Sequence, residues 1–100
     1  MDATNRETIL YILTGAMDEL RRRFSVRELS VFGSVTRGDA ARGGDVDILV
    51  DFEGKATFDA YMDVKFFLED RLGRPVDLVT RKAMRPRIRA AIEGELICVE

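Results

Sequence analysis

The eight residues from Asp45 to Phe52 constrain the fold of this chain more than any other stretch. In this run, Asp-Val-Asp-Ile-Leu-Val-Asp-Phe, apolar side chains stand at every second position. Successive side chains of a β-strand point to opposite faces, so one face of such a strand is apolar and the other carries Asp45, Asp47 and Asp51. The apolar face has to be buried, and the run therefore predicts a strand in a sheet on which helices pack.

A first helix is predicted over about residues 5–23. Thr4 and Glu7 have the spacing of a capping box at its start, and the three arginines at 21–23 suit the negative end of its dipole. The apolar residues that recur at helical intervals within it are Ile9, Leu13, Ala16, Met17 and Leu20.

A second apolar stripe predicts a helix from Phe58 to Leu72, which Gly73 ends. Phe67 lies on the side opposite to this stripe, so it is either buried on a second side of the helix or exposed as an anchor for a partner. Lys65 lies inside the stripe, where its amine either reaches solvent or points toward a functional site.

Three further strands and one further helix complete the expected order of elements. Strands are predicted at 29–32 and 75–79, a last helix over about 86–93, and an edge strand at 96–99. The order helix, strand, loop, strand, helix, strand, helix, strand indicates an α/β (α+β) fold, with a small sheet of about four strands flanked by helices.

The length and composition of the chain fit one small domain. It has 100 residues, of which 46% are apolar and 34% charged, so residues 1–100 are expected to form a single domain. The formal net charge of -2 argues against a protein whose main role is to coat DNA or an anionic membrane. No apolar run is long enough for a membrane span, and the first residues lack the pattern of a signal peptide, so a cytoplasmic location is expected.

The residue types that the chain lacks restrict its chemistry. It has no histidine, and Cys98 is its only cysteine. This removes Cys/His zinc sites, intramolecular disulfides and catalysis by Ser-His or Cys-His pairs. Any chemistry must therefore rest on carboxylates, hydroxyls, lysine, arginine and a hard metal ion.

Asp45 and Asp47 are the strongest candidates for a functional site. They lie two residues apart on one strand face, and two like charges held together need a cation or a proton. Mg²⁺ prefers oxygen ligands and is commonly held by one or two carboxylates together with substrate phosphates. Asp77, on a different predicted strand, is a third candidate ligand that would complete a two-metal cluster. The alternative is an ordinary exposed strand face, although the apolar remainder of the strand favours a central position.

Gly33 and Ser34 stand where the preceding strand ends, before a loop with almost no large aliphatic side chain. Backbone N–H groups and a small hydroxyl at such a point are suited to hold a phosphate. Arg37, a few residues further on, is a candidate for neutralising phosphate charge. A Walker loop is excluded, because Asp39 and Ala40 stand where that motif requires Lys-Ser or Lys-Thr.

The Gly-Ser pair at 33–34, a ten-residue spacer and the Asp-Val-Asp run at 45–47 resemble the signature of the DNA polymerase β-like nucleotidyltransferase superfamily. Residues 32–40 (FGSVTRGDA) and 72–79 (LGRPVDLV) are similar to the minimal nucleotidyltransferases within that superfamily. The resemblance implies the nucleotidyltransferase fold of the polymerase β type, with a mixed sheet. Gly44 departs from the pattern, because the family usually has a serine before the first aspartate.

The resemblance also implies a role for each site residue. Asp45, Asp47 and Asp77 would bind metal, with two Mg²⁺ ions expected, and Asp77 would help to activate the acceptor hydroxyl. The implied nucleotide-binding residues are Gly33, Ser34 and Arg37.

The reaction implied by the resemblance is transfer of AMP from ATP to a hydroxyl of another protein. In the antitoxin branch of the family that acceptor is a tyrosine of a HEPN-domain ribonuclease toxin. AMPylation silences the toxin, and the two proteins are expected to form a hetero-oligomer. The departure at Gly44 removes one hydroxyl contact from the loop but leaves the expected metal ligands in place.

Two other functions stay open from the sequence. The chain is a non-catalytic antitoxin that masks its toxin if the nucleotide site is weak, with Phe67 as an exposed anchor. Alternatively, the five basic residues between 81 and 89 bind nucleic acid. No aromatic residue is interleaved among them for base stacking, which disfavours this last function.

Overall fold

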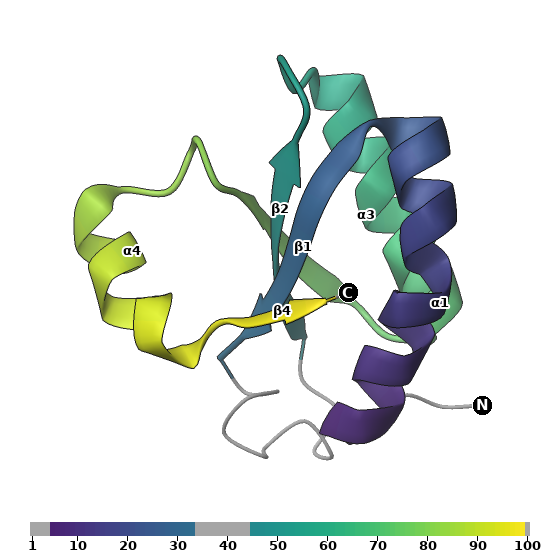
Figure 1. Cartoon of the computed structure of the whole chain (residues 1–100), viewed down its shortest axis with the longest axis horizontal. Helices are drawn as coiled ribbons and strands as arrows, with labels where there is room; N and C mark the ends of the chain where they lie inside the picture. Colours follow the sequence, from purple (N-terminus) through teal and green to yellow (C-terminus); the bar gives the residue numbers. More distant parts are fainter. Residues whose placement is uncertain (1–4, 34–44, 100) are drawn as a thin grey trace.

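The computed structural model describes residues 5–33 and 45–99 of the chain (Figure 1). Its helices and strands follow the order predicted from the sequence. Their bounds are α1 (Arg6–Phe24), β1 (Val26–Phe32), β2 (Val46–Phe52), α3 (Phe58–Leu72), β3 (Val76–Thr80), α4 (Pro86–Ile92), the 3₁₀ turn η2 (Glu93–Glu95) and β4 (Ile97–Val99).

The four strands form one mixed sheet in the order β3-β2-β1-β4. Strand β1 is antiparallel to both β2 and β4, whereas β2 and β3 are parallel and are joined by α3. Parallel neighbours need such a crossover, because the chain must return to the edge of the sheet from which it started. The predicted α/β fold with a four-stranded mixed sheet is confirmed.

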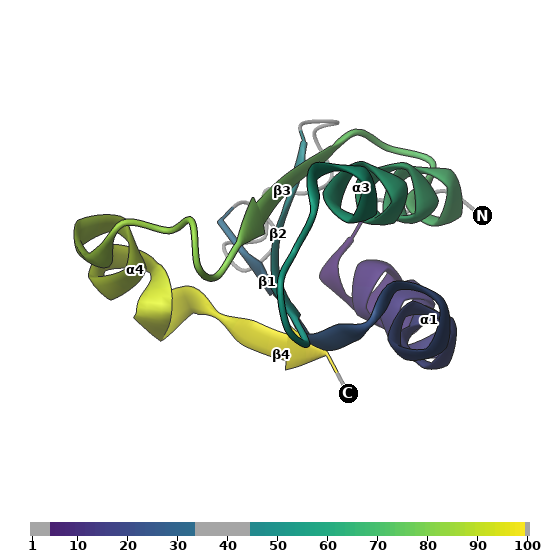
Figure 2. The same ribbon diagram turned by 90° about the horizontal axis from the view of Figure 1, so that it is seen from above.

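Helices α1 and α3 lie side by side on one face of the sheet, and α4 lies on the opposite side (Figure 2). None of the helices within the described residues is long and apolar enough to cross a membrane. The core fills the space between the sheet and the first two helices. Its largest fully buried side chains are Ile9, Leu13, Met17 and Leu20 of α1, Leu68 and Leu72 of α3, and Leu29, Val31, Val46, Ile48 and Val50 of the strands.

Both long helices begin at a capping side chain, and α3 ends where the sequence predicts. The N-cap of α1 is Asn5, whose side-chain oxygen accepts a hydrogen bond from the Thr8 N–H at 2.8 Å. The capping box expected from Thr4 and Glu7 depends on Thr4, which lies outside the described residues; the N-cap that the structure shows is the next residue, Asn5. Helix α3 is capped by Thr57 and ends as predicted at Gly73, which has a φ of +67°.

Phe67 is half-buried between the two long helices, so the alternative of an exposed anchor is wrong for this residue. Its ring centroid lies 5.3 Å from that of Phe24 in α1, and the Arg71 guanidinium lies 4.6 Å from the same Phe67 centroid. Arg71 also forms an ion pair with Glu19 of α1 at 2.7 Å. The exposed aromatic residue in this part of α3 is instead Phe66.

The carboxylate of Glu19 joins the two helices and makes their contact dependent on pH. It accepts hydrogen bonds from Arg23 on its own helix and from Arg71 on α3. The Arg23 hydrogen bond, together with the charges of both arginines, holds the pKa of Glu19 below its ordinary value of 4.5. Because the folded-state pKa is lowered, the stabilisation is present above the ordinary pKa and is lost as the pH falls through the folded-state value.

We therefore expect Glu19→Gln to lower the free energy of unfolding in urea at neutral pH, and to have a smaller effect below about pH 4. The control is Asp18→Asn, which removes an ion pair with Arg22 that stays within α1. Its effect should be smaller than that of Glu19→Gln at neutral pH. A cost of Glu19→Gln that stays constant between pH 7 and pH 3 would contradict the role given to the ionised carboxylate.

Candidate active site

The ends of three strands meet at one edge of the sheet. Strand β1 runs antiparallel to β2, so its last residues lie beside the first residues of β2, and the parallel strand β3 starts at the same edge. Asp47 is paired with Phe32 of β1 on one side and with Asp77 of β3 on the other. The sheet therefore brings together two carboxylates that are far apart in the sequence.

Asp47 and Asp77 point to the side of the sheet that faces away from α1 and α3. Val46 and Val76, which precede them, are buried in the core at 0% and 2% exposure, and successive strand residues point to opposite faces. Neighbouring strands lie about 4.8 Å apart, so side chains at paired positions stand next to each other. Asp47 is half-buried and Asp77 is exposed, which leaves the pair open to a ligand from solvent.

Gly33 lies against Asp47, directly after the end of β1. Its φ of +67° is in the left-handed region, and a Cβ at this position would overlap Oδ2 of Asp47 and lie 3.0 Å from its Cγ. The backbone conformation favours glycine here, and any Cβ would in addition displace the carboxylate of Asp47. The structure thus brings together three of the predicted site residues, Gly33, Asp47 and Asp77.

Glu69, which the sequence analysis did not single out, holds the start of β3. Its Oε2 accepts a hydrogen bond from the Val76 N–H at 2.9 Å, one residue before Asp77. Lys65 Nζ lies 3.6 Å from the same oxygen, which settles the open question about this lysine: its amine pairs along the helix. The last turn of α3 therefore positions the strand that carries Asp77.

The connection after α3 also holds the start of β2. The carbonyl of Pro75 accepts a hydrogen bond from the Val46 N–H at 3.0 Å, so the first residues of both parallel strands are tied together.

One signal for the role of Glu69 was present in the sequence. A glutamate in the last turn of a helix faces the negative end of the dipole, which is unfavourable unless the carboxylate has partners.

The pairing of the strands does not place the other three predicted site residues, Ser34, Arg37 and Asp45. Ser34 and Arg37 lie outside the described residues. Asp45 is exposed and lies immediately before β2. Among the described residues, no three His, Cys, Asp or Glu side chains form a group that could hold a metal ion. The metal site expected from Asp45, Asp47 and Asp77 together stays a prediction.

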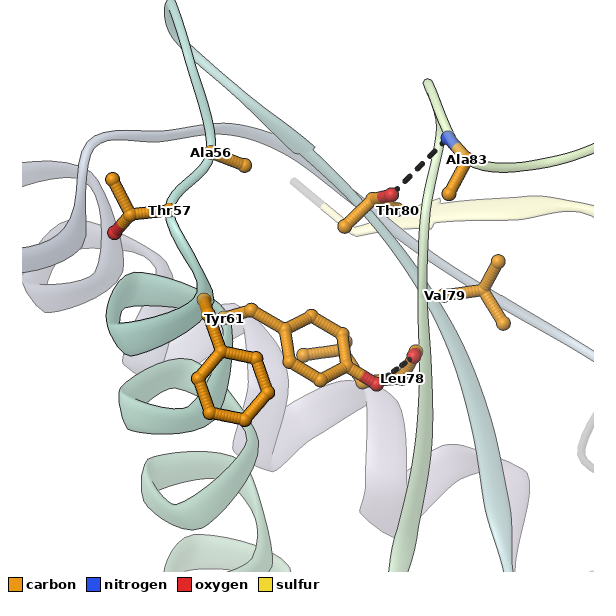
Figure 3. A pocket seen from close by; sticks show the side chains of 8 residues that line it. Ala56, Thr57, Tyr61, Leu78, Val79, Thr80 and Ala83 are labelled. Atoms are coloured by element: carbon orange, nitrogen blue, oxygen red, sulfur yellow. Dashed lines mark hydrogen bonds between the residues drawn. The ribbon is translucent and has the colours of Figure 1, made fainter.

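A separate, mostly apolar cavity of about 370 Å³ lies between the start of α3 and the second half of β3 (Figure 3). The hydroxyl of Tyr61 donates a hydrogen bond to the Leu78 carbonyl at 2.5 Å, and Thr80 Oγ1 accepts one from the Ala83 N–H at 3.2 Å. None of the described site residues lines this cavity. Its lining residues are Ala56, Thr57, Phe58, Tyr61, Leu78, Val79, Thr80 and Ala83.

The sequence of the chain matches a known family. The family model of the nucleotidyltransferase domain matches residues 13–99 of the chain, which include all four strands. The chain belongs to the nucleotidyltransferase domain family. The resemblance noted from the Gly-Ser and Asp-Val-Asp motifs is therefore confirmed, as is the prediction that the chain is a nucleotidyltransferase.

This nucleotidyltransferase domain has relatives of nearly its own length. A protein of Thermococcus cleftensis named protein adenylyltransferase MntA is 43% identical over 93 residues, covering 93% of this chain and 94% of that protein. A protein of Methanocaldococcus jannaschii named as a candidate protein adenylyltransferase is 35% identical over 83 residues, covering 80% of this chain and 83% of that protein.

Solved structures share the fold. A candidate minimal nucleotidyltransferase superposes with a TM-score of 0.77 at 36% identity, over 93% of this chain and 94% of that chain. A toxin-antitoxin structure with AMP-PNP gives a TM-score of 0.71 at 20% identity, over 87% and 72% of the two chains. The structure of a tri-AMPylated Shewanella oneidensis HEPN toxin in complex with MNT antitoxin gives 0.66 at 17% identity, over 91% and 71%. At such low identities the last two establish the fold alone.

The contact between Gly33 and Asp47 can be tested with two matched substitutions. Gly33 and Gly73 have the same φ of +67°, but a Cβ at Gly73 has no atom within 4 Å. We expect Gly73→Ala to cost about 1 kcal/mol of unfolding free energy, from backbone strain alone. Gly33→Ala should cost about 1 to 3 kcal/mol more, because the Asp47 carboxylate has to move. The free energies are measured by urea unfolding.

The extra cost at Gly33 should shrink when Asp47 is also truncated. In the double variant Gly33→Ala/Asp47→Ala the added methyl group no longer meets a carboxylate, so the two substitutions should not be additive. Equal costs of Gly33→Ala and Gly73→Ala would show that the carboxylate does not press on this position.

Proposed function

We propose that this chain transfers AMP from ATP to a tyrosine hydroxyl of a HEPN-type toxin protein and acts as its antitoxin. The observation that carries the proposal is the pairing of Asp47 with Asp77 at the edge of the sheet where Gly33 ends β1. This edge supplies paired carboxylates for a metal and a strand end for a phosphate group. We place the whole activity in one domain, residues 1–100.

The chemistry of the donor set fits Mg²⁺. Carboxylate oxygens are the ligands that this ion prefers, and two carboxylates on neighbouring strands repel each other unless a cation or a proton lies between them. Asp45 and Asp47 would hold the metal, with Asp77 as a third ligand. When bound, Mg²⁺ neutralises the charge that develops on the phosphate and on the attacking and leaving oxygens.

The residues of the chain then have three tasks in the reaction. Gly33 and Ser34 hold the triphosphate, and Arg37 neutralises part of its charge. Asp77 accepts the proton of the acceptor hydroxyl as its oxygen bonds to the α-phosphorus of ATP. The bond between the α-phosphorus and the bridging oxygen breaks in line with the attack, and pyrophosphate leaves.

Both sets of comparisons support a protein acceptor. The Thermococcus relative, at 43% identity, is named a protein adenylyltransferase. One of the structures with the same fold is a complex of an AMPylated HEPN toxin with its antitoxin.

The direct test is the intact mass of a HEPN-type partner after incubation with this chain, ATP and Mg²⁺. We expect the mass to increase by one or more AMP units. Asp47→Asn and Asp77→Asn should each lower the rate of transfer by about a hundredfold or more, because each removes a charge from the reacting centre. Transfer at the wild-type rate by either variant would contradict the assigned site.

Asp51→Asn is the matched control. Asp51 stands on the same face of β2 as Asp47, at the opposite end of the strand and beside Glu28 rather than Asp77. Its substitution should leave the transfer rate within about twofold of the wild type. A stable complex without any mass increase would instead show that the chain neutralises its partner by binding alone.

A further inference from the structure

The charges of the chain are unevenly distributed along it. We call residues 81–92 the basic segment: it contains five lysine and arginine residues and no acid. The other 88 residues contain 11 basic and 18 acidic residues, which gives them a net charge of -7. The proposed transfer reaction assigns no role to this segment, although its charge is opposite to that of the rest of the protein.

The first two basic residues hold the segment to the sheet. The Arg81 N–H donates a hydrogen bond to the Val50 carbonyl at 2.9 Å, and Nη2 of Arg81 lies 4.0 Å from a carboxylate oxygen of Glu28. Lys82 Nζ donates a hydrogen bond to the Gly54 carbonyl at 3.3 Å. These contacts fix where the basic segment leaves the body of the protein.

The other three arginines are free for a partner. Arg85, Arg87 and Arg89 are exposed, and none of them forms a side-chain hydrogen bond or an ion pair with a described residue. Helix α4 has no buried residue, and Ile88, between two of the arginines, is 51% exposed. An exposed aliphatic residue with an arginine on either side of it in the sequence has the composition of a protein interface, where arginine is enriched.

Helix α4 lies on the side of the sheet from which an acceptor must approach. It is opposite to α1 and α3 (Figure 2), and the carboxylates of Asp47 and Asp77 point to that same side. The other face of the sheet is covered by the two long helices. A protein that presents a hydroxyl to Asp77 therefore comes from the side on which the basic segment stands.

We propose that Arg85, Arg87, Ile88 and Arg89 form the docking surface for the acceptor protein, which binds through an acidic patch with an apolar centre. This inference rests on the proposed function. A protein surface is favoured over a nucleic acid because the basic segment contains no aromatic residue on which a base can stack and exposes an aliphatic one. Docking here steers the acceptor electrostatically and raises its concentration at the carboxylates.

The test is a charge reversal on α4 with a matched charge reversal on α1. Arg87→Glu/Arg89→Glu changes one residue in the first turn and one in the last turn of α4, and Arg6→Glu/Arg21→Glu does the same on α1. Binding of a purified HEPN-type protein is measured by titration calorimetry, and AMP transfer by intact mass. Binding of a fluorescent ATP analogue is the second readout, and circular dichroism verifies that each variant is folded.

We expect the α4 variant to raise the Kd for the acceptor about tenfold in low salt, with a smaller ratio in high salt because the interaction is screened. The KM for the acceptor should rise in parallel, while kcat and nucleotide binding stay near wild-type values. The α1 variant should change the acceptor Kd by less than about twofold.

Several results would overturn the docking surface. Equal acceptor affinity of the two variants, or no wild-type affinity for the acceptor, contradicts it directly. Loss of nucleotide binding in the α4 variant would make the arginines part of the ATP site. Weaker binding of a labelled single-stranded RNA, with unchanged acceptor affinity, would make the segment a nucleic-acid site. If the wild-type chain binds the acceptor but transfers no AMP, the proposed reaction fails while the comparison of Kd values still decides the docking surface.

Discussion

The parallel pairing of β2 with β3 sets Asp47 beside Asp77, and most other features of the molecule serve to hold this pair in place. Like charges at adjacent positions of a sheet repel each other, so the surrounding structure has to fix them. Strand β2 lies inside the sheet, Glu69 and Pro75 tie the starts of both strands to the end of α3, and Gly33 leaves room for one carboxylate.

The two sides of the sheet have separate roles. One side of the sheet packs on α1 and α3 and forms the core. The two helices are held together by the ion pair of Glu19 with Arg71 and by the contact between the rings of Phe24 and Phe67. The other side carries the carboxylates of Asp47 and Asp77. The exposed helix α4, which forms the end of the basic segment, lies on this side as well. This division lets a chain of 100 residues keep an apolar core on one side of the sheet while charged groups stay accessible on the other.

The sequence was sufficient for features that repeat along the chain or mark its ends. Alternation in 45–52 predicted the faces of β2, and the glycine at 73 predicted the end of α3. The sequence was insufficient for contacts between segments that are far apart in the chain. The bond from Val76 to Glu69 and the contact of Phe67 with α1 depend on the packing of helices and strands, which periodicity does not specify. The strand pattern and the family resemblance both singled out the aspartates, but the pairing of Asp47 with Asp77 follows from the strand register.

The most direct test of this account is a titration with Mn²⁺, a paramagnetic substitute for Mg²⁺, followed by NMR of the side-chain carboxyl carbons and the backbone amides. We expect the signals of Asp47, Asp77 and Gly33 to broaden first, while that of Asp51 at the other end of β2 persists. Broadening that is centred on Asp51, or that is equal for all carboxylates, would contradict a metal site at the edge of the sheet where β2 and β3 begin.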